Sequence, residues 1–263
     1  MGILNITPDS FFDGGKCITE ESIIRHTEKM LSEGADILDI GACSTRPNAP
    51  EISEEEELKR LIPAIKLVRK KFPNAIISVD TFRSNVAERS VQEGADMIND
   101  ISGGTFDKKM MKIAGNLQVP YILMHIQGTP ETMQKNPTYE NVTEEVGNYF
   151  TERIHAAIDR GIKQIIIDPG FGFGKTLEHN YELLKNISSF KKLGLPILAG
   201  LSRKSMINKV LGTKPEGALN GTTAVNTIAL MNGVNILRVH DVKEAKEAIQ
   251  IFTFALKQVI NNR

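Results

Sequence analysis

Short apolar segments alternate with longer stretches of helical periodicity along the whole chain, and this alternation constrains the fold more than any other feature. A strand followed repeatedly by a helix favours a parallel sheet, because each helix carries the chain back to where the next strand begins. Amphipathic helices are predicted between the strands, among them 20–32, 54–71 and 241–259. The eight segments predicted to be strands are Ile3–Ile6, Ile37–Ile40, Ile76–Asp80, Met97–Asp100, Tyr121–Met124, Gln164–Asp168, Ile197–Gly200 and Ile236–His240.

A short internal repeat strengthens this count. The segment Glu33–Asp39 (EGADILD) recurs as Glu93–Asn99 (EGADMIN), and Asn232–Arg238 (NGVNILR) has the same shape. In each copy a glycine that ends a helix leads into a strand with polar last residues. A longer version is Arg160-Gly161 ahead of Asp168, so every second strand has such an entry. We therefore predict one domain, residues 1–263, folded as a (β/α)8 TIM barrel of the α/β class.

An open, doubly wound α/β sheet is the alternative architecture. That fold normally carries a glycine-rich turn after its first strand, where it binds a nucleotide phosphate. Here Asn5-Ile6-Thr7-Pro8 follows the first predicted strand instead. The barrel is therefore favoured.

Composition excludes several classes of function. The 263 residues include 32 basic and 32 acidic side chains, so no net charge points to nucleic acid or a membrane surface as partner. No apolar run approaches the roughly 20 residues of a membrane span. The two cysteines, Cys17 and Cys43, lack zinc spacing and have no base nearby, so we interpret both as unreactive thiols. These features favour a cytoplasmic location.

Polar side chains stand at the carboxyl end of nearly every predicted strand. In such barrels the active site lies at this end. One polar strand end is equally well explained as a cap, but a nearly complete set indicates a single concave polar site. The residues concerned are Asn5, Asp39, Asp80, Asn99, His125, Asp168, Ser202, Arg238 and His240.

Two of these residues, Asp80 and Asp168, are carboxylates that follow the third and sixth strands. They suit a metal cluster, an acid–base pair, or anchors for the donor groups of a ligand. No histidine or glutamate lies near them in sequence, so the spacing does not support a metal cluster. A ligand with an amino group and a ring N–H suits them, and Asn99 adds both a donor and an acceptor.

Basic residues gather after the last two strands. Arg238 and His240 are two residues apart on one strand and are expected to point to the same face. Arg238 alone is as well explained by a salt bridge at the rim. For Arg203 alone, a capped and solvated helix start is the less favoured alternative. Together with the run 202–205 (Ser-Arg-Lys-Ser) they predict a phosphate site, because many barrels bind phosphate here and a helix N-terminus adds N–H donors.

The glycine-rich segment Asp168–Lys175 (DPGFGFGK) is neither a Walker loop nor a dinucleotide fingerprint, because Pro169 and Lys175 occupy positions that need glycine. We predict a flexible loop that approaches a ligand closely, with Phe173 covering a flat ring or packing in the core. Two further segments, Thr7–Gly15 and Ala42–Pro47, have the length and position of lids or substrate contacts.

These segments together resemble the dihydropteroate synthase family. The matching runs follow the family's order over essentially the whole chain: Gly2–Phe11, Asp13–Gly15, Ser44–Pro47, Ser78–Thr81, Ile98–Asp100, Leu123–His125, Asp168–Lys175, Ser202–Lys204 and Arg238–His240. Each run is weak alone, but the ordered set is specific.

The resemblance implies an enzyme of folate biosynthesis that joins (7,8-dihydropterin-6-yl)methyl diphosphate to p-aminobenzoate and releases pyrophosphate. It implies Mg²⁺ as cofactor, sulfonamides as inhibitors and a homodimer. The expected ligands divide into three groups: Asp80, Asn99, Asp168, Phe173 and Lys204 at the pterin; Asn5 at the metal, with Thr45, Arg238 and His240 at the diphosphate; and Phe11, Asp13, Arg46, Pro47 and Ser205 at p-aminobenzoate. Of these, Asp80, Asp168, Lys204, Arg238 and His240 are the expected catalytic residues.

The chain departs from the family pattern in its first two loops, at Phe12, Ala42, Cys43 and Asn48. These departures bear on loop shape and inhibitor contacts. Two other functions remain as alternatives: a methyltransferase that passes a methyl group from methyltetrahydrofolate to a corrinoid, and a non-catalytic pterin-binding protein. The first would not need the Ser44–Pro47 loop or the Arg238–His240 site, and the second would be expected to lose residues such as Asn5 and Asp13.

Overall fold

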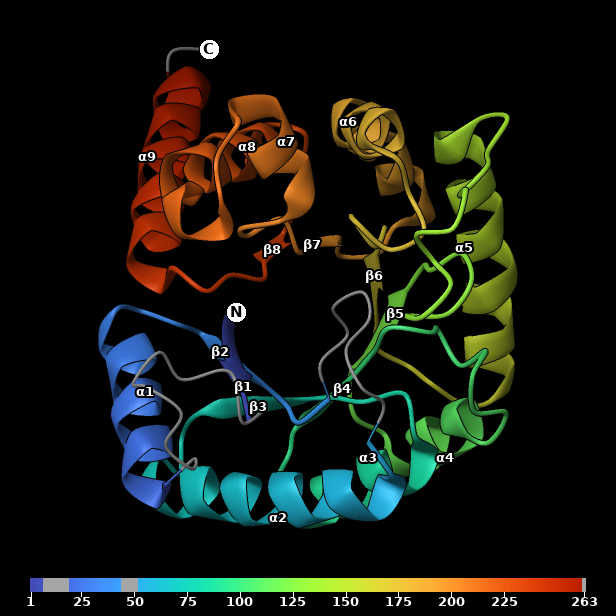
Figure 1. Cartoon of the computed structure of the whole chain (residues 1–263), viewed down its shortest axis with the longest axis vertical. Helices are drawn as coiled ribbons and strands as arrows, with labels where there is room; N and C mark the ends of the chain where they lie inside the picture. The colour runs from blue at the N-terminus through green and yellow to red at the C-terminus, as the bar shows by residue number, and fades with distance from the viewer. Residues whose placement is uncertain (7–18, 44–51, 262–263) are drawn as a thin grey trace.

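Eight strands form the centre of the molecule and helices surround them (Figure 1). The structure, a computed structural model, describes residues 1–6, 19–43 and 52–261. In chain order the elements are β1 (Gly2–Asn5), α1 (Glu20–Ser32), β2 (Ile37–Gly41), α2 (Glu54–Lys71), β3 (Ile76–Asp80), α3 (Ser84–Gln92), β4 (Met97–Asp100), α4 (Met110–Leu117), β5 (Tyr121–Met124), α5 (Val142–Asp159), β6 (Ile165–Asp168), α6 (Leu177–Asn186), the 3₁₀ turn η1 (Ile187–Leu193), β7 (Leu198–Ala199), α7 (Ser205–Leu211), η2 (Pro215–Gly217), α8 (Leu219–Met231), β8 (Ile236–Leu237) and α9 (Val242–Asn261).

The strands close into a circle. Parallel pairing runs from β1 to β6 and again from β7 to β8. Parallel bridges join the two parts, Ile167 with Ile197 on one side and Gly2 with Val239 on the other. At the second closure the amide of Ile3 donates to the carbonyl of Val239 over 3.0 Å. A doubly wound sheet would leave two open edges, so the (β/α)8 barrel predicted from the sequence is confirmed.

The predicted strands agree with the structure to within one residue at each end, apart from the end of β8. The strands β3, β4 and β5 and the helices α1 and α2 have the predicted bounds. Strands β7 and β8 are shorter than predicted. After β8 the amide of His240 donates to the side-chain oxygen of Ser202 at 3.2 Å, where a longer strand would have used a backbone carbonyl.

The repeated sequence marks the entries to the even-numbered strands. The glycines before β2, β4, β6 and β8 all have a positive φ, between 87° and 112°: Gly34, Gly94, Gly161 and Gly233. This left-handed conformation ends each helix and favours glycine strongly over other residues. The repeat therefore encodes four equivalent helix-to-strand turns.

The described residues form three apolar clusters, one of which, with Ile101 and Met124, lies where β4 and β5 end. The largest cluster lies between strands and helices and includes Leu38, Val79 and Ile98. A smaller one, with Met97 and Ile166, occupies the other face of the strands, which is the barrel interior. Side chains two residues further along each strand point the same way. The interior is therefore filled at the N-terminal half and lined by polar groups at the carboxyl ends.

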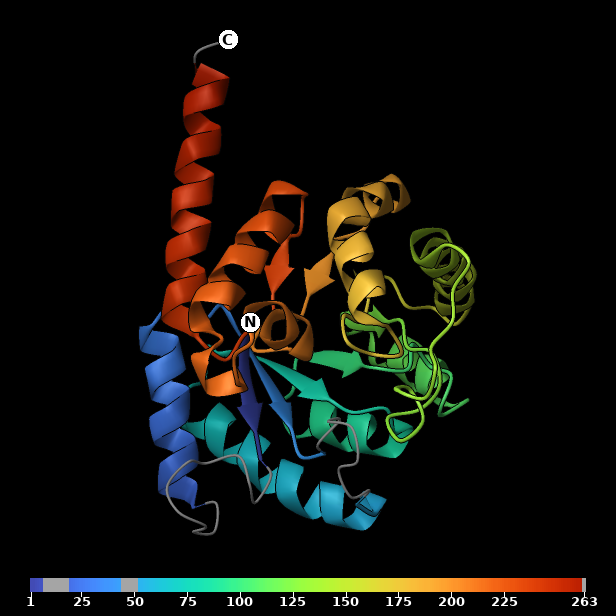
Figure 2. The same ribbon diagram turned by 45° about the horizontal axis from the view of Figure 1, so that its top comes forward.

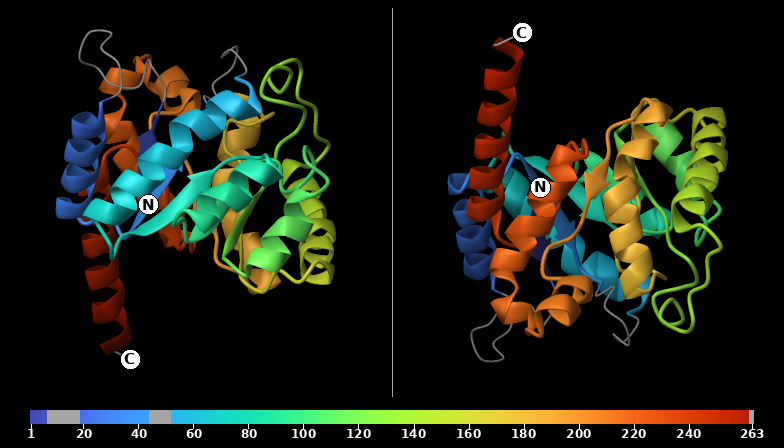
Figure 3. Two further views of the ribbon diagram at one scale, coloured as in Figure 1. Left: turned by 90° about the horizontal axis from the view of Figure 1, so that it is seen from below. Right: turned by 90° about the horizontal axis from the view of Figure 1, so that it is seen from above.

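Helix α9 continues beyond the barrel at the C-terminus, as the turned views show (Figures 2 and 3). Its projecting part exposes the side chains of Ile251 and Phe254, which are 72% and 67% accessible. Within the described part of the chain, no helix is both long and apolar enough to cross a membrane.

Candidate active site

The carboxyl ends of the strands bring five of the predicted residues into one cluster. Asp80 and Asn99 are side by side in the register of β3 and β4. Arg238 follows β8 and donates from Nη2 to Asp80 Oδ2 at 2.6 Å. Asp168 ends β6, and its charge interacts with those of Lys204 and Arg238. The long-range grouping that the strand ends predicted is therefore present.

Asp39 lies beneath this cluster; the sequence predicted it as one of the polar strand ends but indicated no partner for it. Its side chain is fully buried. Its Oδ2 accepts from Arg238 Nε at 2.6 Å and from Asn99 Nδ2 at 3.0 Å. Asn99 therefore retains Oδ1 and its second N–H for a ligand. The alternation of Ile37, Asp39 and Gly41 along β2 was the signal that places Asp39 inside the barrel.

Arg238 is thus engaged by two carboxylates, those of Asp39 and Asp80. The two carboxylates raise its pKa against the effect of burial. Burial raises the pKa of Asp80 to about 7, with Arg238 opposing the shift. A diphosphate bound at Arg238 would therefore share the guanidinium with two buried carboxylates. The Nη1 group has no hydrogen-bond acceptor among the described residues, so it is the part of the guanidinium left for such a ligand.

Arg238 and His240 lie in different environments. The guanidinium enters the barrel, whereas His240 is exposed and its Nδ1 lies 3.0 Å from the hydroxyl oxygen of Ser202. Sequence spacing predicted a common face because it assumed a strand through His240. Since β8 ends at Leu237, the two side chains are not held on one strand.

Asp168, Lys204 and Phe173 form the second part of the cluster. Asp168 is buried, and its Oδ1 accepts from the amide of Gly170 at 2.8 Å. Burial raises the pKa of Asp168, with Lys204 opposing the shift. Lys204 donates to the carbonyl of Phe171, and its Nζ lies 4.6 Å from the centre of the Phe173 ring. Burial lowers the pKa of Lys204 to about 8. The half-buried Phe173 also packs against the apolar cluster that includes Ile101 and Met124, so the structure shows the core packing that was one of the two roles predicted for it.

Arg203 points away from this cluster, although it belongs to the same short motif. Its Nε and Nη2 make a bidentate pair with Asp241 at 2.9 and 2.7 Å. The backbone φ of Arg203 is +57°, a left-handed conformation that favours glycine. The motif therefore contributes Ser202 and Lys204 to the site, and Ser205 begins α7 as an exposed residue.

The glycine-rich segment after β6 is tightly held, contrary to the flexible loop predicted. A side chain on Gly170 would come within 1.9 Å of the carbonyl oxygen of His125, and one on Gly174 within 2.4 Å of that of Gln127. Both glycines have a positive φ. They are required for packing against the segment after β5, whereas Gly172 faces the side chain of Lys204.

Several expected residues fall outside the described part of the chain: Phe11, Asp13, Thr45, Arg46 and Pro47, together with Phe12, Cys17 and Asn48. Of the two loops, the structure describes Ala42, which is fully buried, and Cys43, a half-buried free thiol. Burial and the charge of Glu57 raise the pKa of Cys43 to about 12. This supports its interpretation as unreactive.

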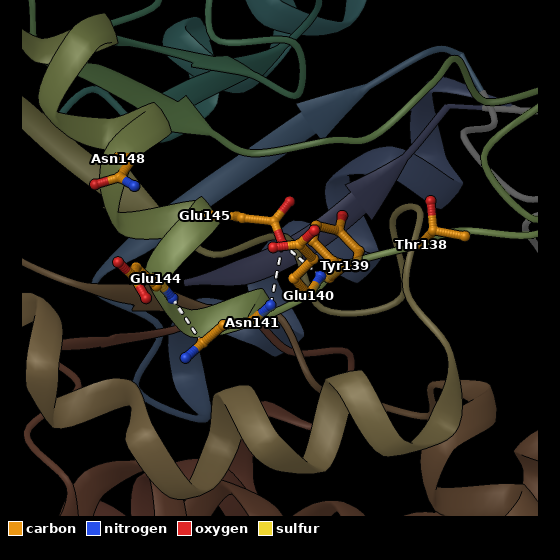
Figure 4. A pocket seen from close by; sticks show the side chains of 7 residues that line it. All are labelled: Thr138, Tyr139, Glu140, Asn141, Glu144, Glu145 and Asn148. Atoms are coloured by element: carbon orange, nitrogen blue, oxygen red, sulfur yellow. Dashed lines mark hydrogen bonds between the residues drawn. The ribbon is translucent and has the colours of Figure 1, made fainter.

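A surface pocket beside α5 contains none of the predicted site residues (Figure 4). One of its carboxylates caps the helix: Glu145 Oε1 accepts from the amides of Glu140 and Asn141 at 2.8 and 3.1 Å. Such a cluster of acids would repel a diphosphate. The lining residues are Thr138, Tyr139, Glu140, Asn141, Glu144, Glu145 and Asn148.

The fold and the cluster define a class: a barrel enzyme with a polar, charged site at the carboxyl ends of its strands. Comparison with known proteins narrows this class. Residues 1–240 match the family described as pterin binding enzyme. Dihydropteroate synthase of Escherichia coli K12 is 44% identical over 100% of this chain and 93% of its own length. That of Haemophilus influenzae is 45% identical over 96% of this chain and 92% of its own length.

Solved structures agree with this result. Dihydropteroate synthase of Yersinia pestis, in a sulfonamide complex, superposes with a TM-score of 0.93 at 41% identity and covers 97% of this chain and 93% of its own. The Xanthomonas albilineans enzyme with 4-aminobenzoic acid gives 0.91 at 40% identity, with 97% and 92% covered. The chain belongs to the dihydropteroate synthase family of pterin-binding enzymes.

Proposed function

We propose that the chain joins (7,8-dihydropterin-6-yl)methyl diphosphate to p-aminobenzoate, giving 7,8-dihydropteroate and pyrophosphate. The observation that carries the proposal is the cluster of Asp80, Asn99, Asp168 and Lys204 at the strand ends of a family barrel. In the reaction the C–O bond between the pterin methylene and the diphosphate breaks. A C–N bond to the aniline forms, and the amine loses one proton.

The pterin fits the buried part of the cluster. Asp168 keeps Oδ2 free of protein donors in the described structure, so it can accept from the amino group and ring N–H of a pterin. Lys204 and Phe173 lie beside it, with an ammonium over an aromatic face. Asp80 and Asn99 take the opposite edge of the ring. The same carboxylates stabilise positive charge at the methylene as the diphosphate leaves.

We place p-aminobenzoate towards the first two loops, at Phe11, Asp13, Arg46, Pro47 and Ser205. Support comes from the Xanthomonas relative solved with 4-aminobenzoic acid and the Yersinia relative in a sulfonamide complex. A sulfonamide carries the same aniline ring, so it should compete with p-aminobenzoate for this side of the site.

Magnesium is proposed as the cofactor, held mainly by the substrate. Mg²⁺ binds through few protein ligands, several waters and the phosphates of a substrate. Asn5 ends β1 as a half-buried amide, and its register partner Gly41 lies against the side chain of Asp80. A hard amide oxygen at this place fits such an ion. Mg²⁺ would neutralise the diphosphate, to which Thr45, Arg238 and His240 would also bind.

Asn5→Ala tests the metal proposal. We expect the variant to need more Mg²⁺ for half-maximal turnover, because one ligand is lost, and excess chelator to abolish wild-type turnover. The measurement is a magnesium titration of initial rates, with pterin binding followed separately by calorimetry. Full activity of the wild type in chelator would exclude the role of the metal.

A homodimer is proposed through α8 and α9, which pack on each other. Met231 on α8 and Ile251 and Phe254 on α9 are exposed apolar side chains, 71%, 72% and 67% accessible. We propose that a second copy of the chain covers them. Phe254→Glu should shift the dimer to a monomer in sedimentation velocity, while the same change at exposed Ile158 on α5 should not. A monomeric wild type would contradict the proposal.

A cytoplasmic location is also proposed. Its support is that Cys43 is a free thiol, as expected for a reducing compartment.

Assays of both chemistries distinguish the proposed function from its alternatives. A dihydropteroate synthase releases pyrophosphate only when both substrates are present. A corrinoid methyltransferase would consume methyltetrahydrofolate instead, and a non-catalytic pterin-binding protein would bind pterin without turnover. Pyrophosphate release that needs both substrates supports the proposal, and methyl transfer without such release would replace it.

A further inference from the structure

Lys175 is a buried amine to which the proposed reaction assigns no role. Burial lowers its pKa to about 7, with the charge of Asp168 opposing the shift. Its side chain is 3% accessible. Its Nζ has three acceptors, His125 Nδ1 at 2.9 Å and the carbonyl oxygens of Gly170 and Phe173 at 3.1 and 3.0 Å. An ammonium group has three donors and no acceptor, so these partners match its protonated form.

His125 is suited to accept this hydrogen bond. The residue is 6% accessible and follows β5. Burial and the charge of Lys175 lower the pKa of His125 to about 2, which keeps the ring neutral with one nitrogen as acceptor. Its ring stacks edge-on against Tyr149 at 4.8 Å between centroids, and its amide donates to the carbonyl of Asp168 at 3.0 Å. His125 is thus fixed on the end of the barrel.

The turn held by Lys175 carries the proposed pterin contacts. Gly170 begins the turn and donates its amide to Asp168. Phe173 ends it, under the ammonium of Lys204. Lys204 holds the same turn through the carbonyl of Phe171. Lys175 therefore binds the carbonyls of Gly170 and Phe173, and Lys204 binds the carbonyl of Phe171 between them. Lys204 lies on the side of the proposed ligand and Lys175 on the side of the core.

We propose that Lys175 and His125 form a buried clamp that positions the turn 170–173, and with it Asp168 and Phe173, for the pterin. Lys175 does not touch the substrate in this arrangement and is a positioning residue. The inference rests on the proposed function, because it names the ligand whose contacts the turn carries.

Without the Lys175 amine, the carbonyl of Phe173 loses this donor, whereas the carbonyl of Gly170 keeps the amide of Phe173 at 3.0 Å. The turn would then relax to find other donors, and Phe173 would move from its place against Lys204. Asp168 would still end β6, because its backbone is held by the barrel. The expected consequence is a weaker pterin site on an intact fold.

Calorimetric titration with 6-hydroxymethylpterin tests the clamp. Lys175→Met keeps the length of the side chain and removes its donors. We expect its pterin Kd to rise at least about tenfold, the effect of losing roughly one charge-assisted hydrogen bond, with a stoichiometry near one. Lys185→Met, an exposed position on α6, is the matched control and should bind as the wild type does.

Two histidine variants keep the test valid where Lys175→Met folds poorly. His125→Asn retains an acceptor near the Nδ1 position and should bind pterin nearly as the wild type does, whereas His125→Leu should bind as weakly as Lys175→Met. A purely structural role predicts fewer binding sites with unchanged Kd. A wild-type Kd in Lys175→Met and His125→Leu would overturn the clamp, while failure of the wild type to bind pterin would instead overturn the proposed function.

Discussion

Replacing Arg238 with methionine should lower the free energy of unfolding by about 3–5 kcal/mol at pH 7, the usual result of removing one partner of a buried ion pair. Arg238 contacts Asp39 and Asp80, each at 2.6 Å, and Asp39 is fully buried. Methionine leaves both carboxylates in the barrel without a cation. Turnover should be lost as well, because the same side chain lines the site. Denaturant unfolding and a rate assay measure the two effects.

The loss of unfolding free energy in Arg238→Met should depend on pH. Burial already raises the pKa of Asp80 to about 7 and Arg238 opposes this shift, so without Arg238 the folded state binds more protons at Asp80 than the unfolded state, where the aspartate pKa is about 3.9. The stabilisation from this proton is full below about pH 4 and is lost as the pH rises through the raised pKa of Asp80. The difference in the free energy of unfolding between the wild type and Arg238→Met should therefore become smaller as the pH falls from 8 to 5.

A second substitution provides the control. Arg238→Met combined with Asp39→Asn removes one of the two carboxylates left without a cation. The double variant should recover part of the stability at pH 7, though not the activity. Equal stability of Arg238→Met and the wild type at pH 8 would mean that these ion pairs do not hold the barrel.

Asp168→Asn should weaken pterin binding at least about tenfold, since hydrogen bonds to a charged partner are each worth roughly 1.5–3 kcal/mol. The amide presents a donor to the pterin's N–H groups and no longer balances the charge of Lys204. The fold should persist, because the carbonyl oxygen of the new side chain can still accept from the amide of Gly170, as Asp168 does at 2.8 Å. Calorimetry with a pterin measures the change, and wild-type affinity would remove Asp168 from the pterin site.

The barrel could be predicted from the sequence because the patterns that indicate its strands and helix ends are local. Each strand is an apolar run, and glycines such as Gly34 and Gly94 mark helix ends that the chain adopts wherever it lies. The end of β8 escaped prediction because the amide of His240 donates to the side chain of Ser202 and not to a backbone carbonyl.

The residues of the candidate site could be predicted, but not their pairing. Parallel strands bring their last residues to one end of the barrel, which predicts Asp80, Asn99 and Asp168 together. The contact of Arg238 with Asp39 joins residues 199 apart in sequence, and no local pattern indicates it. Arg203 shares a motif with Lys204 but turns to Asp241, because its backbone takes a left-handed conformation that the sequence does not signal.

The most direct test of the account is to quantify both products of one reaction mixture that contains the purified chain, Mg²⁺, the pterin diphosphate and p-aminobenzoate. The account predicts dihydropteroate and pyrophosphate in equal amounts, neither formed when one substrate is omitted, and both strongly reduced in Arg238→Met. Pyrophosphate without dihydropteroate, or no product from a protein that binds pterin, would contradict the claim that this barrel makes dihydropteroate.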